Sequence, residues 1–159
     1  MDNLTHSLVG AVLAEILFHQ TSLAQSRKRA WPVRTVFWWV GFLGSNLADL
    51  DVLYAGGLVT PSALGSLLHH RGHTHTVVFA LLEGFLLAFG AKKWLDRKRY
   101  IFPASDQWAL SVLAFVSPLF HLFFDALNFY GVHPFWPFWN GWIFGDTFFI
   151  CEPLLWIAF

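Results

Sequence analysis

Apolar residues in this chain fall into five segments that are separated by polar stretches. The segments are Leu4–Phe18, Val33–Ala48, Val77–Ala91, Trp108–Tyr130 and Trp142–Phe159. A helix needs about 20 apolar residues to span a bilayer. We therefore expect the first three to extend into their flanks, to tilt or to thin the membrane locally. The pattern predicts an all-α fold, in which residues 1–159 form one polytopic bundle of about five transmembrane helices.

The apolar segments contain small residues at intervals of four, as in Gly10/Ala14 and Gly41/Ser45. Such stripes let two helices approach closely in lipid, where hydrophobicity itself supplies little association. The last segment ends at Phe159 with no polar cap, glycine or flanking charge, which a normal helix end would carry. We therefore expect that the natural chain continues beyond this point or that the sequence is a fragment.

Composition supports a membrane protein over the alternative of a compact soluble helical protein. The chain is 56% hydrophobic and 13% charged, against a usual charged share of about 25%. The net charge is zero and no basic surface is evident, so nucleic acid is not an expected partner. The single cysteine excludes an intramolecular disulfide and a Cys-rich zinc site. A metal would therefore have to use histidine and carboxylate ligands.

The basic residues predict how the bundle is oriented. All Lys and Arg residues except Arg71 lie either between the first and second segments or between the third and fourth, at Arg27, Lys28, Arg29, Arg34, Lys92, Lys93, Arg97, Lys98 and Arg99. Cytoplasmic loops carry such an excess of Lys and Arg, so both loops are predicted to be cytoplasmic. The N-terminus, the loop 49–76 and the loop 128–142 then lie on the other face of the membrane.

The stretch His69–Thr76 contains four of the eight histidines. Imidazole is the commonest metal ligand among side chains, although a solvated polar loop would give the same composition. The predicted topology strengthens the metal interpretation, because other His and Asp residues fall at the same ends of their helices. They are His6, Asp49, Asp51, His70, His73, His75, His121, Asp125 and Asp146. Mixed His and carboxylate ligands suit zinc, or manganese and iron, with one or more ions bound.

Simpler interpretations of these residues stay open. Asp49 and Asp51 fit polar residues that end a helix in water, and His121 and Asp125 fit an interhelical hydrogen bond. Arg71 fits either a phosphate or a carboxylate partner, or an ion pair with Asp51. The chain as a whole also fits a metal-binding or ion-transport protein, with a path through Glu15, Glu83, His121 and Asp125, or a non-catalytic membrane scaffold.

Several of these motifs, taken in order, resemble the YdjM-like family of membrane-bound metal-dependent hydrolases of the bacterial inner membrane. They are the opening Met1-Asp2-Asn3-Leu4-Thr5-His6-Ser7, Asp49-Leu50-Asp51, His70-Arg71-x-x-Thr74-His75, and His121-x-x-x-Asp125 followed by Tyr130-Gly131-Val132. The chain departs from the family pattern at Asn46-Leu47-Ala48, where a proline usually precedes the first Asp, and at Thr76, where Ser often follows the His. Neither departure removes a ligand.

The resemblance implies a metal site formed by His6, Asp49, Asp51, His70, His75, His121 and Asp125. We expect a divalent ion, zinc above all, to activate a water molecule there for hydrolysis of a phosphoester or lipid-linked substrate at the periplasmic face. A carboxylate that is not a ligand would act as general base, with Asp51 and Asp146 as the candidates.

Overall fold

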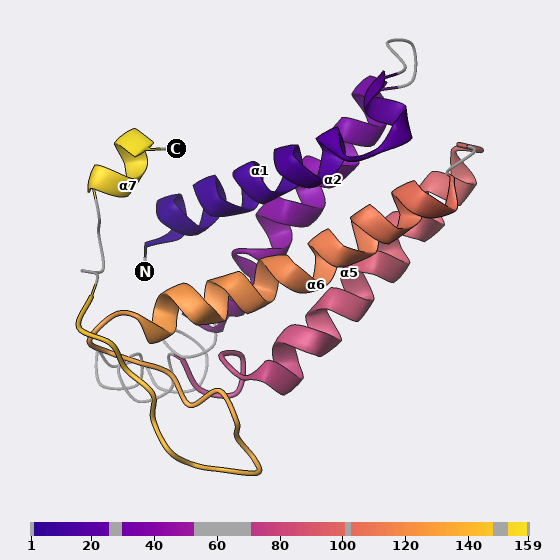
Figure 1. Cartoon of the computed structure of the whole chain (residues 1–159). Helices are drawn as coiled ribbons and strands as arrows, with labels where there is room; N and C mark the ends of the chain where they lie inside the picture. Colours follow the sequence, from indigo (N-terminus) through magenta and orange to yellow (C-terminus); the bar gives the residue numbers. More distant parts are fainter. Residues whose placement is uncertain (1, 26–29, 53–70, 101–102, 148–152, 159) are drawn as a thin grey trace.

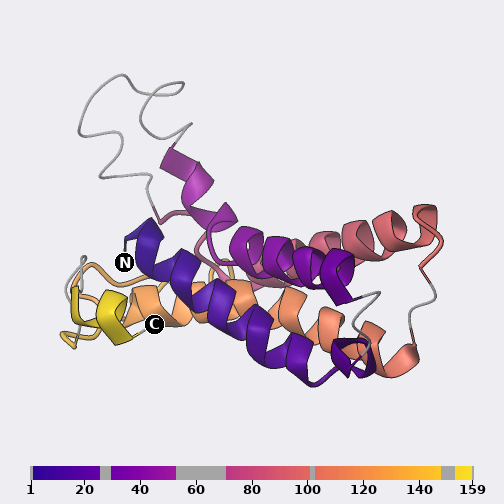
Figure 2. The ribbon, with the colours of Figure 1, turned by 90° about the horizontal axis from the view of Figure 1, so that it is seen from above.

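The computed structural model describes residues 2–25, 30–52, 71–100, 103–147 and 153–158. Four long helices run side by side as a bundle (Figures 1 and 2), namely α1 (Asn3–His19), α2 (Ala30–Gly44), α5 (Val77–Arg97) and α6 (Ala104–Ala126). Shorter elements are the 3₁₀ turns η1 (Ser22–Gln25) and η2 (Leu47–Leu50) and the C-terminal helix α7 (Pro153–Ala158). The described part contains no β-strand beyond one isolated bridge. The predicted all-α fold is confirmed.

Side-chain caps fix the starts of two helices at the same end of the bundle. Asp2 precedes α1, and its Oδ1 accepts a hydrogen bond from the backbone N–H of Thr5 at 3.0 Å. Thr76 precedes α5, and its Oγ1 accepts one from the N–H of Phe79 at 3.1 Å. Each cap satisfies an N–H group that the helix itself leaves unpaired, a contribution of about 1 kcal/mol. Both helix starts, and the residues beside them, are thereby held in place.

The predicted close approach of helices occurs between α1 and α2. A Cβ atom added to Gly10 would overlap the carbonyl oxygen of Gly41, and one added to Gly41 would overlap that of Gly10. The core lies between this crossing and the far end of the bundle, and its buried members are Ala14, Phe18, Val33, Val36, Phe37, Val40, Leu95, Leu110, Leu113 and Ala114.

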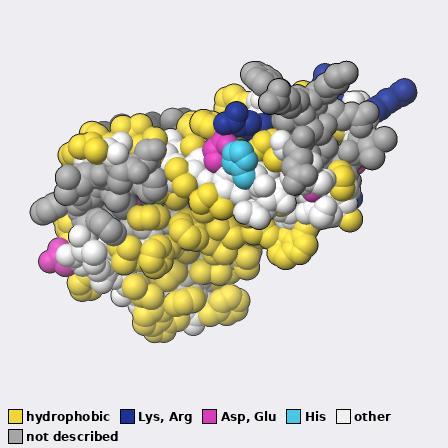
Figure 3. Space-filling model, turned by 45° about the horizontal axis from the view of Figure 1, so that its top comes forward, with side chains coloured by type: hydrophobic (Ala, Val, Ile, Leu, Met, Phe, Trp, Pro, Cys, Tyr) yellow, Lys and Arg dark blue, Asp and Glu magenta, His cyan; other side chains and the backbone are white. Residues whose placement is uncertain are grey.

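Apolar side chains also cover much of the outside of the bundle. Figure 3 shows a broad hydrophobic patch on one face, and exposed residues such as Trp39 (58%), Phe85 (59%) and Phe123 (55%) lie on three different helices. Among the described residues, α6 is the one helix that is long and apolar enough to cross a membrane. Five membrane-spanning helices are therefore not shown, and the multi-pass topology stays a prediction.

The helix predicted over Trp142–Phe159 is wrong at its start. Ile143 instead pairs with Val132 in the isolated bridge, and α7 begins only at Pro153. The reason lies in the end of α6, whose last carbonyl groups have no partner within the helix. The N–H of Gly145 donates to the carbonyl of Ala126 at 2.7 Å and that of Thr147 to the carbonyl of Leu127 at 3.1 Å. These bonds hold residues 142–147 in an extended path across the end of α6.

Candidate metal centre

Four buried side chains converge at the end of the bundle where α1 and α5 begin and α6 ends. Asp49 comes from η2, His75 from the loop before α5, and His121 and Asp125 from α6. One possible ligand atom from each lies within 4.8 Å of the other three, so the group can hold a metal ion. None of the four side chains is more than 9% exposed. The predicted meeting of His and Asp residues from distant parts of the chain is therefore present.

The spacing of these atoms fits ligands around one small ion. The Nε2 atom of His75 lies 3.2 Å from His121 Nε2, 3.2 Å from Asp125 Oδ2 and 3.4 Å from Asp49 Oδ1. His121 Nε2 lies 3.7 Å from Asp49 Oδ1 and 3.8 Å from Asp125 Oδ2. Ligands in a tetrahedron around zinc, with bonds of about 2.0–2.1 Å, lie about 3.3–3.4 Å apart. The observed separations of 3.2–3.8 Å match that arrangement closely.

Hydrogen bonds at the far side of each imidazole direct its Nε2 atom toward the centre. His121 Nδ1 lies 2.9 Å from the carbonyl oxygen of Ser45. A carbonyl can only accept, so Nδ1 carries the hydrogen and the Nε2 lone pair faces the cluster. His75 Nδ1 lies 3.0 Å from Thr74 Oγ1, and that hydroxyl donates to Asp51 Oδ2 at 2.8 Å. Such outer contacts fix the orientation of histidine ligands in metal sites.

The structure places Asp51 behind His75 rather than among the four converging residues. Its Oδ2 accepts hydrogen bonds from the backbone N–H of Arg71 at 2.9 Å and from Thr74 Oγ1 at 2.8 Å. The same oxygen lies 3.4 Å from His75 Nδ1, the ring nitrogen that points away from the cluster. Sequence reasoning did not separate Asp51 from Asp49. Their side chains lie on opposite sides of one imidazole ring.

Arg71 holds Asp125 in place from the loop that also carries His75. Its Nη2 lies 3.3 Å from Asp125 Oδ1, and its Nη1 donates to Asn128 Oδ1 at 2.9 Å. A second bond from Nη1 reaches the carbonyl of Gly131 at 3.3 Å. Gly131 has φ +67°, and a Cβ there would overlap the carbonyl oxygen of Ile143. The side chain of Arg71 thus pairs with Asp125, whereas Asp51 is bound by its backbone N–H.

His6 lies beside the cluster but is not one of the four. Its Nε2 is 3.3 Å from Asp125 Oδ1, and its ring centroid is 4.0 Å from that of His121. The side chain is buried on the first turn of α1, next to the capped residue Thr5. His6 therefore contacts the outer oxygen of Asp125, on the same side as Arg71.

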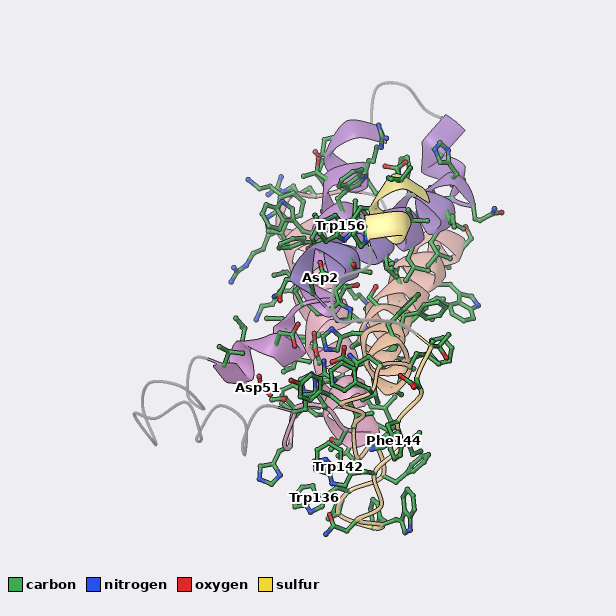
Figure 4. The ribbon with its side chains drawn as sticks, turned by 90° about the vertical axis from the view of Figure 1, so that its left-hand side faces the viewer. Asp2, Asp51, Trp136, Trp142, Phe144 and Trp156 are labelled. Carbon is green, nitrogen blue, oxygen red and sulfur yellow. The ribbon has the colours of Figure 1, made fainter. Side chains whose placement is uncertain are left out.

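Other residues proposed from the sequence are not brought together with the cluster. His69 and His70 lie outside the described residues. His73 is exposed, and its ring lies 4.4 Å from that of Trp136. Asp146 is exposed on the extended segment after the bridge, and it contacts none of the four converging residues in the part of the chain that is described. Figure 4 views this end, with Asp51, Trp136 and Trp142 labelled.

Sequence reasoning missed three groups that support the centre. They are the carbonyl of Ser45, the hydroxyl of Thr74 and the amide of Asn128, each bonded to a member of the site or its support. Thr74 was visible only as part of the motif that ends at His75. Asn128 lies three residues after Asp125, one turn along, and the buried partner that Arg71 needs was the available signal.

Charge at the centre favours a cation. Burial raises the pKa of Asp49, but the hydrogen bond from His75 and the nearby His121 and His6 together hold it below its usual value. Burial lowers the pKa of His75, but its contacts with Asp125, Asp49 and Asp51 outweigh this and raise the pKa to about 10. In the metal-free centre a proton on His75 therefore sits between carboxylates, at the position where a metal ion would compete with it.

Ion transport through the bundle is not favoured by the position of Glu15. This carboxylate lies at the other end of α1, where Oε1 accepts a hydrogen bond from Arg34 Nε at 2.8 Å and another from Trp38 Nε1. His19 Nε2 lies 3.4 Å from its second oxygen. Glu15 is thus held at the surface of the far end by partners of its own, away from the metal centre.

A family model described as the YdjM inner membrane protein matches residues 1–159, the full length of the sequence. The chain belongs to the YdjM family. No curated protein and no solved structure matches it.

Membership of the YdjM family confirms the resemblance seen in the sequence and places the chain among inner membrane proteins. It also accounts for the exposed apolar side chains on α2, α5 and α6, because lipid covers such surfaces in a membrane protein. The family description names neither a metal nor a reaction. The chemistry of this YdjM-family chain therefore has to be inferred from the centre itself.

Proposed function

We propose that this chain is a membrane-bound, metal-dependent hydrolase that cleaves a phosphoester or a lipid-linked substrate. One observation carries the proposal, namely the convergence of Asp49, His75, His121 and Asp125 with ligand atoms 3.2–3.8 Å apart. Two imidazoles and two carboxylates at this spacing favour zinc, with manganese or iron as the alternatives. When bound, such an ion lowers the pKa of a water molecule and polarises the phosphoryl group.

The chain's own residues then have distinct roles. Asp51 positions His75 through Thr74, and Arg71 positions Asp125, so both inner ligands are held by charged partners. Asp49 is the best candidate to accept a proton, because its buried Oδ2 has no hydrogen-bond partner among the described residues. Asp51 is less suited to that role, since its Oδ2 already accepts two hydrogen bonds. Asp146 remains a predicted second acceptor.

In the hydrolysis that these roles serve, the oxygen of water forms a bond to phosphorus while the bond to the leaving alcohol breaks. One proton of the water leaves through Asp49, and the leaving alcohol gains a proton. The substrate would approach from the end of the bundle, where His73 is exposed beside the cluster. With the basic loops in the cytoplasm, this end faces the periplasm.

Metal analysis of the purified protein tests the proposal most directly. Wild type and His73→Ala should each bind about one equivalent of zinc, and His75→Ala, His121→Ala and Asp125→Ala should lose it. His73→Ala is the matched control, because His73 lies two residues from His75 but outside the cluster. Only wild type and the control should hydrolyse bis(4-nitrophenyl) phosphate. Equal, substoichiometric metal in all five proteins would refute the site, and bound metal without turnover would indicate a metal-binding role instead.

Topology is tested by labelling cysteines from outside the cell. In a Cys151→Ser background, a cysteine at Phe138 should react with a membrane-impermeant maleimide, since Phe138 is 87% exposed at the end that carries the centre. A cysteine at Lys98, at the opposite end of α5, should react only after the membrane is opened. The reverse pattern would overturn the proposed orientation.

A further inference from the structure

A cavity of about 550 Å³ lies beside the metal centre, between η2 and the first half of α5. We call it the side cavity. Its walls are apolar, with Leu47 and Leu50 on η2 and Phe79, Leu82 and Leu86 on α5. A space of this size with apolar walls and few polar groups is typical of a ligand site.

One end of the side cavity reaches the support of the metal centre. Asp51 and Thr74 line the cavity, and both also hold His75. The hydroxyl of Thr74 lies 3.0 Å from His75 Nδ1. A molecule in the cavity would therefore lie one residue away from a ligand of the centre. The cavity and the centre form a continuous site in which a polar end adjoins an apolar space.

Glu83 is an unpaired acidic group within the apolar part of the cavity. Its side chain is only 5% exposed, and neither carboxyl oxygen has a hydrogen-bond partner among the described residues. It lies six residues into α5, a rise of about 9 Å from the helix start. A buried polar group without a partner is costly. Glu83 is thus positioned to hydrogen-bond to a molecule that enters the cavity.

The side cavity opens on the flank of the bundle. Leu50, Leu82 and Leu86 line it and are each at least half exposed, so its rim is apolar. In an inner membrane protein, lipid covers apolar flanks of this kind. A hydrocarbon chain can therefore enter from the bilayer and leave its polar head at the end near Asp51 and Thr74.

We propose that the side cavity binds the apolar chain of an amphiphilic phosphoester taken from the bilayer. The head group lies at the His/Asp centre, and Glu83 hydrogen-bonds to a polar group at the start of the chain. This inference rests on the proposed hydrolase function and narrows it, because it makes the substrate a membrane amphiphile and not a small soluble phosphoester. The carboxyl group of Glu83 selects a chain with a hydrogen-bonding group over plain hydrocarbon.

The test compares two substrates that differ only in chain length, 4-nitrophenyl methyl phosphate and 4-nitrophenyl hexadecyl phosphate. Wild type should prefer the hexadecyl ester in kcat/KM. Leu82→Trp, which fills the cavity, should lower that preference by about tenfold, the effect expected from excluding two methylene groups from an apolar site. Leu81→Trp is the matched control, since Leu81 is exposed on the same helix but does not line the cavity. Equal preferences in Leu82→Trp and Leu81→Trp would overturn the inference.

A second measurement stands apart from turnover. Hexadecyl phosphate with a diazirine in its chain should label α5 near Leu82 and Leu86 after illumination, and Leu82→Trp or Glu83→Leu should reduce this labelling while Leu81→Trp should not. Labelling unaffected by Leu82→Trp would sink the inference even if the protein proved an active hydrolase. Normal labelling in a protein that binds no metal and cleaves neither ester would refute the proposed function alone.

Discussion

Replacing Asp51 by Asn separates a positioning role from direct metal ligation. Asn has nearly the same shape, and its carbonyl oxygen can still accept from the Arg71 N–H and the Thr74 hydroxyl, now at 2.9 and 2.8 Å from Asp51 Oδ2. The substitution removes only the negative charge 3.4 Å from His75 Nδ1. We therefore expect the centre to keep its geometry but to bind metal more weakly.

The size of the effect follows from the place of Asp51 behind His75. Loss of a group that orients a metal ligand lowers affinity about 10–100-fold, which corresponds to about 1.4–2.8 kcal/mol of binding free energy. Zinc affinity can be measured by competition with a chromophoric chelator, for wild type, Asp51→Asn and His75→Ala. Asp96→Asn is the control, since Asp96 is an exposed acidic residue at the other end of α5.

Two outcomes would refute the reasoning about Asp51. Affinity equal to that of wild type would mean that the carboxylate does not act on His75. Affinity as low as in His75→Ala would mean that Asp51 is itself a ligand, as the sequence alone predicted. Either result requires that the variants fold, which far-UV circular dichroism and thermal unfolding in detergent establish.

Three further predictions concern the proton, the bundle and the support of the centre. The pKa of His75 is raised from 6.5 to about 10, so its proton stabilises the metal-free fold fully below pH 6.5 and this contribution is lost as the pH rises through 10; zinc affinity should therefore increase up to about pH 10, and calorimetry at pH 8 in two buffers of different ionisation enthalpy should show about one proton released per ion. Gly10→Ala, whose Cβ would overlap α2, should destabilise the fold by about 1–3 kcal/mol, whereas Gly90→Ala, with open space around it, should stabilise it by about 0.5–1 kcal/mol, as measured by unfolding in detergent; equal effects would contradict the close helix crossing. Arg71→Lys cannot contact both Asn128 and Asp125, so it should lower zinc affinity by about tenfold, and unchanged affinity in the chelator assay would remove Arg71 from the support of the centre.

The sequence predicted the helices well because their signals are local. Apolar runs marked α1, α2, α5 and α6, and the spacing of Gly10 and Gly41 indicated the crossing that the structure contains. The meeting of Asp49, His75, His121 and Asp125 was also foreseeable, since topology alone puts those helix ends on one side.

The path of residues 142–147 and the role of Asp51 could not be predicted in the same way. Ile143 and its neighbours are as apolar as a membrane helix, and only the unpaired carbonyls at the end of α6 favour the extended path over a helix. Asp49 and Asp51 are two residues apart, and their separation by the ring of His75 depends on a long-range contact. Hydrophobic patterns carry no information about which oxygen faces which nitrogen.

The position of the centre at the C-terminal end of α6 sets an order of events. The aligned peptide dipoles of a helix place roughly half a negative charge at its C-terminus, and Asp125 belongs to the last turn of α6. This field adds to the carboxylates of Asp49, Asp51 and Asp125, against which Arg71 is the one described guanidinium in contact. An anionic head group is repelled by such an environment until a cation has entered. We therefore expect metal to bind first and phosphoester second, so that substrate analogues protect the protein from unfolding only when a divalent ion is already present.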